Sequence, residues 1–365
     1  MTEIQVKQRA LRVALVSWAT IGVLLLAGAV WWVLGQVSGA LTPFLIAGIV
    51  VLVLRAPVDR LEAQGVPRAL SVVIWYVFGL TVIGVFFAVI APIVAEQVLD
   101  LINTFPRYYE PIADFWLDVQ DKAEGLALPE WVRTAFDSVG LSMLSQVAAW
   151  GRALGNGLVG LGGAAAGFVF NVLLALVIAF WALKDMPKMR DEIMLLIGER
   201  RRGEAEMIMS TVFRVLAGYI RGQLLVSTVT GVLATIGLAI LGVPYAIALG
   251  VITGVLNVVP YVGPFIGGLL AAIVGLFISP WIGLGAIAVV VAAQQVTDLF
   301  VTPRVMSEQV DLHPVLVIFS LLVGGSLFGF WGLILGIPVA AVLKGLFVYY
   351  YEKHTETSLT SEDGA

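Results

Sequence analysis

The feature that most constrains the fold is a run of 76 consecutive residues, 222–297, that contains no Asp, Glu, Lys or Arg. A helix of about 20 apolar residues spans the hydrocarbon core of a bilayer, so a run of this length has room for about three membrane passes. Near its middle, the block Pro260-Tyr-Val-Gly-Pro264 interrupts the helical pattern. Broken backbone at membrane depth is tolerated only where protein or a water-lined cavity satisfies its N–H and C=O groups. Pro260–Pro264 is therefore the first candidate for a functional site.

Composition extends this prediction to the whole chain. Hydrophobic residues make up 60% of the 365 residues and charged residues 13%, whereas a soluble domain has about 25% charged residues. We therefore expect an all-α polytopic membrane protein with about eight transmembrane segments. The absence of Cys excludes thiolate nucleophiles and Cys-ligated metal centres. With two His, no nucleotide-binding or hydrolase motif and no basic patch, we expect no enzyme, no cofactor, no metal and no nucleic-acid partner.

Four apolar segments in the first half are expected to span the membrane: Val13–Leu34, Leu41–Leu54, Ala69–Ala95 and Ala153–Leu183. The third is expected to end at Pro92, because proline interrupts a helix. The uncharged stretch continues from the first segment into the second, which is too long for a cleaved signal peptide. We therefore interpret the first segment as a retained anchor.

Charge predicts the orientation. The loops Arg55–Arg68 and Lys184–Arg214 and the N-terminus are basic, and short cytoplasmic loops concentrate Lys and Arg. Segment 96–152 carries nine acids against four basic residues, so we place it outside. Both termini are then cytoplasmic.

The acidic segment also has its own periodicity. Apolar and aromatic residues recur at three- and four-residue spacing between Val98 and Val119, which predicts an amphipathic helix. Such a helix could lie on the membrane surface or pack between protomers. The core of a small extramembrane subdomain is an equally good interpretation.

The second half contains a weak internal repeat. A shift of 70 residues superimposes Pro244 on Pro314 and Gly254 on Gly324, and each half has a span followed by a broken apolar stretch. The breaks are Pro260–Pro264 and Gly324–Gly329. Each stretch is either a re-entrant hairpin or one long kinked span. A hairpin pair would form an inverted repeat, which in secondary transporters holds substrate between broken helices near the midplane.

The expected organisation therefore has five parts: a three-span region (1–95), an extracytoplasmic helical segment (96–152), the fourth span with a basic loop (153–214), a transport core with the repeat (215–351) and a polar tail (352–365).

Polar residues beside the two breaks are the candidate binding groups. An ionisable residue in an apolar span is a functional candidate by default, and Asp298 is therefore a candidate for ion coupling. Its alternative interpretation is a solvated Asp at a helix end, near Thr302 and Arg304. The candidate substrate-binding residues are Gln223, Asn257, Pro260, Tyr261, Gly263, Pro264, Gln294, Gly324, Gly325 and Ser326.

Several short motifs lie in order along most of residues 11–350: Leu41-Thr-Pro-Phe-Leu-Ile-Ala47, Pro57-Val-Asp-Arg-Leu61 with Pro67-Arg68, Lys184-Asp185, Tyr219-Ile-Arg-Gly-Gln223, Leu241-Gly-Val-Pro-Tyr-Ala246, Asn257-Val-Val-Pro-Tyr-Val-Gly-Pro264, Pro303-Arg-Val-Met306, Leu312-His-Pro314 and Gly324-Gly325 to Gly336-Ile-Pro338. Together these motifs resemble those of the autoinducer-2 exporter family of bacterial membrane proteins. The resemblance implies a multi-pass inner-membrane protein that forms homo-oligomers, exports small molecules and moves a transport unit like an elevator. Members similar to this chain have been assigned autoinducer-2 export, and others sodium/proton antiport. The family usually has an acid followed by Asn before Pro303, whereas this chain has Asp298-Leu299.

Three functions follow from these observations. The first is export of a small, polar, weakly charged solute without ATP, for example an autoinducer-2-like molecule, held between the two breaks. The second is cation/proton antiport through Asp298. The third is a non-transporting membrane scaffold built around segment 96–152.

Overall fold

The computed structural model describes residues 40–124, 167–306 and 312–355, with four further single positions at Trp18, Gly22, Ser138 and Ser142. Within these residues every regular element is helical, and six helices are long and apolar enough to cross a membrane. This confirms the expected all-α polytopic fold. The span predicted at Val13–Leu34 and most of 125–166 lie outside the described residues. The helices are Ala40–Ala63, α2 (Arg68–Glu124), Gly167–Ile197, α4 (Arg202–Ile240), α5 (Ala246–Leu256), α6 (Val262–Leu276), α7 (Pro280–Val296), α8 (Thr302–Met306) and α9 (Pro314–Thr355), with a short 3-10 helix η1 (Glu199–Arg201) and a π-helix η2 (Thr297–Val301).

The helices Ala40–Ala63, α2 and Gly167–Ile197 pack together as a first bundle. Its core is mainly Ala and Val, and Val58, Val72, Ala179 and Leu183 are fully buried. At one end of the bundle, Arg68 donates to Asp59 (3.1 Å), to Glu62 (2.6 Å) and to the carbonyl of Leu183 (2.8 Å). One arginine at the start of α2 thus contacts all three helices of the bundle.

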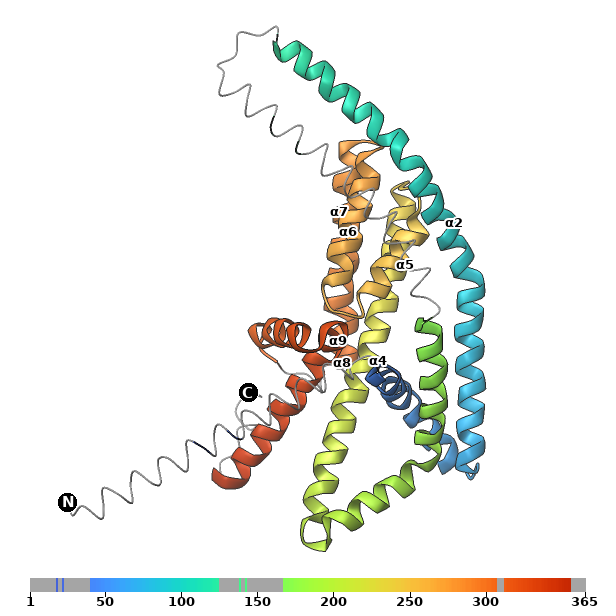
Figure 1. Ribbon diagram of the computed structural model, residues 1–365, viewed down its shortest axis with the longest axis vertical. Coiled ribbons are helices and arrows are strands. Elements are labelled where there is room, and N and C mark those ends of the chain that lie inside the picture. The colour runs from blue at the N-terminus through green and yellow to red at the C-terminus, as the bar shows by residue number, and fades with distance from the viewer. Residues whose placement is uncertain are drawn as a thin grey trace, which may run out of the picture.

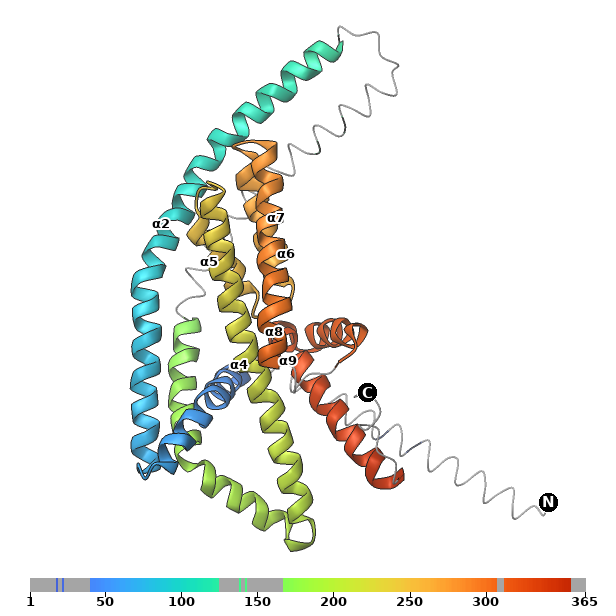
Figure 2. The ribbon, with the colours of Figure 1, turned by 180° about the vertical axis from the view of Figure 1, so that it is seen from behind.

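Helix α2 corrects one expectation. It is a single helix of 57 residues that passes through Pro92 and continues into the acidic segment, so the expected end at Pro92 is wrong. Proline removes one backbone donor, and here the helix continues past it. Figures 1 and 2 show α2 arching along one side of the molecule to beyond the ends of α5 and α7.

Helices α4, α5, α6 and α7 form a second bundle around their own core, in which Ala234, Leu238, Ala271, Ala286 and Val290 are fully buried. Within it, α5 and α6 lie side by side (Figures 1 and 2). At about 1.5 Å per residue, both are shorter than a bilayer core of about 30 Å.

The arms α5 and α6 run antiparallel, and we call this pair the first hairpin. A Cβ on Gly263 would lie 2.5 Å from the Asn257 nitrogen, and one on Gly267 would lie 2.0 Å from Thr253 Oγ1. Glycines on α6 therefore let the two backbones meet. The turn between them, residues 257–261, ends at Tyr261 in a left-handed conformation (φ 68°).

Helix α9 also folds back on itself, at Gly329 (φ 57°, ψ −134°). A Cβ on Gly324 would lie 2.3 Å from the Gly332 oxygen, and one on Gly336 would lie 2.5 Å from the Ser320 oxygen. In a straight helix, residues 16 positions apart would be separated by about 24 Å. The two arms of α9 on either side of Gly329 are therefore antiparallel, and we call them the second hairpin.

Candidate functional site

The tip of the first hairpin is held by a group of buried and partly buried polar side chains from four elements, here called the hairpin-tip network. Its members are Gln223 and Thr230 on α4, Asn257 at the end of α5, Gln294 on α7, and Thr297 and Asp298 in η2. Asn257, Thr230 and Thr297 are fully buried, and Gln223 is 6% exposed. Four of the six members were candidates from the sequence, and the fold brings these four together.

Gln223 holds the end of α5. The last carbonyl groups of a helix have no partner within it, and the Gln223 side chain donates to the backbone oxygen of Asn257 over 2.5 Å. The break in the apolar stretch is thereby satisfied by a side chain from a neighbouring helix, as broken backbone inside a membrane protein requires.

The side chain of Asn257 joins α4 to α7. Its Nδ2 donates to Thr230 Oγ1 (3.2 Å) and to Gln294 Oε1 (3.4 Å). The Thr230 hydroxyl donates in turn to Thr297 Oγ1 (3.1 Å), which donates to the Ala293 carbonyl (2.8 Å). The sequence interpretation did not include Thr230 or Thr297. The available signal was helical spacing, since Gln223, Ser227 and Thr230 recur on one face of α4.

The network ends at a carboxylate. Gln294 Nε2 donates to Asp298 Oδ1 over 2.8 Å, and Asp298 is partly buried. It lies in the π-helix η2, which extends α7 before α8. Single π-helical turns within helices occur often at functional sites. Among the described residues no group of three or more His, Cys, Asp or Glu is placed to hold a metal ion.

Two buried polar atoms at this site lack a protein partner: Asn257 Oδ1 and Ser227 Oγ. Buried polar groups are almost always hydrogen-bonded, and an unsatisfied one costs about 1–3 kcal/mol. The amide oxygen of Asn257 accepts a hydrogen bond, and the hydroxyl of Ser227 can accept or donate one. A polar ligand or a water could satisfy both.

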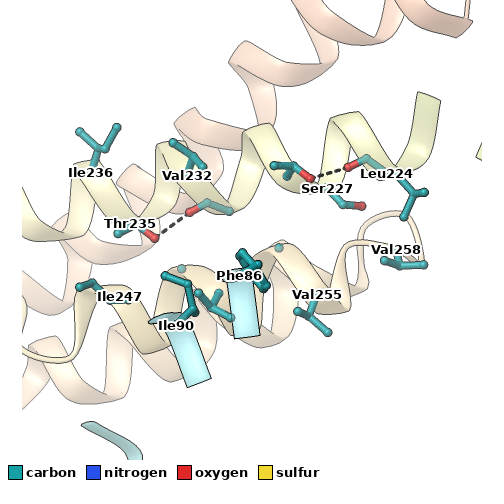
Figure 3. A pocket seen from close by; sticks show the side chains of 15 residues that line it. Phe86, Ile90, Leu224, Ser227, Val232, Thr235, Ile236, Ile247, Val255 and Val258 are labelled. Carbon is teal, nitrogen blue, oxygen red and sulfur yellow. Dashed lines mark hydrogen bonds between the residues drawn. The ribbon is translucent and has the colours of Figure 1, made fainter. Parts of the chain in front are cut away.

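Ser227 also lines a cavity of about 460 Å³ between α2, α4 and α5. Figure 3 shows its lining side chains, among them Phe86 and Ile90 of α2, with Val258 of the hairpin turn at one end. Apart from the hydroxyls of Ser227, Thr228 and Thr235, its lining is apolar side chains and glycine. The cavity therefore reaches the hairpin tip beside the network.

The remaining candidates lie elsewhere. Tyr261 is 60% exposed, Pro260 and Pro264 are partly buried, and Gly263 serves the close packing of α5 on α6. Gly324 and Gly325 pack against the opposite arm of the second hairpin. Ser326 is exposed and donates to the Val323 carbonyl (2.9 Å).

The two hairpins meet through apolar side chains rather than through these glycines. Val259 in the first turn belongs to the same core as Ile334 and Ile337 on the second arm of α9, together with Tyr219 and Ile220 of α4. Among the hydrogen bonds of the described residues, none joins Gly324, Gly325 or Ser326 to the hairpin-tip network.

Comparison with known proteins identifies the family. A sequence profile described as "AI-2E family transporter" matches residues 20–352. The chain is 33% identical over 319 residues to "Putative transport protein YueF" of Bacillus subtilis, covering 86% of this chain and 84% of that protein. It is 32% identical over 323 residues to "Putative permease PerM" of Escherichia coli, covering 85% and 87%. These matches agree with a fold of long apolar helices in which polar side chains hold the break between α5 and α6. They show that the chain is a membrane transporter that belongs to the AI-2E family.

Proposed function

We propose that the chain exports a small, neutral, polar solute, of the autoinducer-2 type, which binds where the 460 Å³ cavity meets the hairpin-tip network. The observation that carries this proposal is the pair of buried, unpartnered atoms Asn257 Oδ1 and Ser227 Oγ. Apart from Asp298, the surrounding groups are hydroxyls and amides, which suit a hydroxylated molecule better than an ion.

An elevator-like movement of the second bundle against the first is part of the proposal. The two bundles have separate apolar cores, which supports movement of one as a unit. At the far end of α5, Gln97 Oε1 accepts from the Ala248 amide (2.9 Å) and Asp100 accepts from the Tyr245 hydroxyl (2.8 Å). These contacts between α2 and the first hairpin would have to break during such a movement.

The proposed topology places the first hairpin as a re-entrant element that enters from outside. Figure 1 draws the basic turn before α2 and the basic start of α4 at the same lower end, and the first hairpin opens toward the other end. The second arm of α9 runs toward the end with the basic loops. This arrangement supports cytoplasmic termini in the bacterial inner membrane and an inverted repeat.

Efflux from proteoliposomes tests the substrate class. Vesicles are loaded with autoinducer-2 or, separately, with glycerol as a small polyol. Release of autoinducer-2 should be faster with the wild-type protein than with Asn257→Ala. Ser326→Ala should release it at the wild-type rate. Equal release from wild-type and protein-free vesicles would refute export of this class of solute.

A cross-link tests the movement, because the chain contains no native cysteine. The variant Gln97→Cys with Ala248→Cys, joined by a short thiol-reactive cross-linker, should stop transport. Each single-cysteine variant treated in the same way should remain active. Transport at the wild-type rate by fully cross-linked protein would exclude this elevator movement.

Cation/proton antiport is the second candidate, and one observation favours it: the network ends on the Asp298 carboxylate, within an apolar span. An antiporter that uses this carboxylate should lose sodium-driven proton movement in Asp298→Asn vesicles. A solute exporter should keep efflux without a sodium gradient. Unchanged proton movement in Asp298→Asn vesicles would remove the carboxylate from the mechanism.

A further inference from the structure

A second cavity, of about 230 Å³, lies between the helix Ala40–Ala63 of the first bundle and α4 of the second. Unlike the cavity beside the hairpin tip, it is lined by charged side chains. Arg55 and Asp59 contribute from one helix, and Arg214 and Arg221 from the other. We call it the arginine pocket.

The positive charge of the arginine pocket is not balanced by the protein. Its single carboxylate, Asp59, pairs with Arg55 (3.3 Å) and also with Arg68 outside the pocket (3.1 Å). Arg214 has no ion pair among those found in the described residues. Three guanidinium groups therefore share part of one negative charge.

Arg221 supplies an unused donor. One of its terminal nitrogens donates to the Leu52 carbonyl (2.5 Å), whereas its Nε is buried without a partner. Arg55 and Arg221 carry like charges and line the same cavity, so they repel each other. A buried donor on a charged group is costly when it has no acceptor. An anion in the pocket would satisfy the donor and relieve the repulsion together.

The pocket is also partly pre-formed. The Arg55 guanidinium lies over the Phe213 ring, 4.5 Å from its centroid, and is held by Asp59. Ser210 adds a hydroxyl to the wall. Planar guanidinium groups present paired N–H donors that match the oxygens of a phosphate group.

We propose that the arginine pocket binds a phosphate group, carried either by an anionic lipid headgroup or by a free phosphate ion. The pocket lies beside the basic turn before α2, the end that the charge distribution assigns to the cytoplasm. A bound phosphate contacts arginines from both bundles, so it bridges the helix Ala40–Ala63 and α4. Its occupancy therefore stabilises the arrangement of the two bundles seen here.

Thermal unfolding of the purified full-length protein in neutral detergent tests this. The probes are sodium phosphate and a short-chain phosphatidylglycerol, with short-chain phosphatidylcholine as the zwitterionic control and sodium chloride added to equalise ionic strength. A ligand that binds only the folded state raises the unfolding midpoint with concentration. The variants are Arg214→Gln, which is exposed, and Arg221→Gln.

The matched control is Arg200→Gln. Arg200 is an exposed arginine in the neighbouring basic loop that does not line the pocket, so its loss changes the net charge equally. A charge-assisted hydrogen bond is worth about 1.5–3 kcal/mol, so its loss weakens binding by about tenfold to a hundredfold. We expect that loss in both pocket variants and less than a twofold change, about the size of a screened surface charge effect, in the control.

The two sources give different results. If phosphatidylglycerol raises the unfolding midpoint and phosphate does not, the ligand is a lipid headgroup. If phosphate raises the unfolding midpoint, the pocket is a site for the free ion. If neither probe raises the wild-type midpoint, or if Arg214→Gln responds no more weakly than the control Arg200→Gln, the proposal is wrong. Arg214→Gln alone decides the question if Arg221→Gln does not fold.

Discussion

The first hairpin, α5–α6, and the second, within α9, are both antiparallel pairs of helical arms, but their tips differ in chemistry. The first turn contains a fully buried Asn257, which is held by side chains from α4 and α7. The second turn, at Gly329, is flanked by exposed Phe328 and Phe330. Both hairpins close through glycine, whereas only the first gathers buried polar groups at its tip among the described residues.

This difference assigns the hairpins separate tasks in the proposed mechanism. The first carries polar atoms to the end of a cavity. The second packs Ile334 and Ile337 against Val259 in the turn of the first hairpin. Its Trp331 also donates to Thr42 (3.2 Å) at the start of the helix Ala40–Ala63. The first hairpin is thus a candidate for binding, and the second a candidate for support between bundles.

The largest expected effect tests what the hairpins share. Gly263→Ala would bring a Cβ to 2.3 Å from the Thr253 oxygen, and Gly332→Ala to 1.8 Å from the Gly324 oxygen. Because these neighbours are backbone atoms, we expect each variant to lose about 3 kcal/mol or more of folding free energy. Thermal unfolding in detergent measures the loss.

Gly345→Ala is the control, since nothing lies within 4 Å of its Cβ position and the residue is in α9. That change should be neutral or stabilise by up to about 1 kcal/mol. A wild-type midpoint for Gly332→Ala would mean that the second hairpin is open.

The next effect tests how the tips differ. Asn257→Ala removes two side-chain hydrogen bonds from a fully buried site, so we expect about 1–3 kcal/mol of destabilisation and at least about a tenfold loss of efflux. Ser326→Ala removes one bond on an exposed side chain and should change stability by less than about 0.5 kcal/mol. Proteoliposome efflux and unfolding midpoints measure both. Comparable losses of efflux would show that the two tips share binding.

The smallest effect sharpens the polar assignment within the first hairpin. Thr230→Val keeps the shape of a fully buried side chain but removes the oxygen between Asn257 and Thr297. We expect the folding free energy to fall by about 1 kcal/mol, and we expect several-fold slower efflux if the network holds the substrate site. Thr211→Val, also on α4 but away from the cavity, removes only a bond to Met207 of its own helix and should leave efflux unchanged. If the two variants behave alike, the network does not act through Thr230.

Much of the candidate site could be predicted from the sequence because a polar residue in an apolar run stands out. Gln223, Asn257, Gln294 and Asp298 were candidates on that ground, and they lie in one network. Threonine does not stand out in the same way, because its hydroxyl can bond to its own helix, as Thr253 bonds to the Leu249 carbonyl. Thr230 and Thr297 therefore became candidates only once α4 and η2 were seen to face each other.

The sequence by itself determined the membrane class, the helical elements and the two breaks, because hydrophobicity and helix-breaking residues act locally along the chain. Only the tertiary structure decided that α2 continues through Pro92 and that Gly324–Ser326 lie apart from the network. It also decided that three arginines from separate bundles meet at one pocket. These outcomes depend on which helix faces are packed together across long sequence separations, and no local pattern specifies that packing.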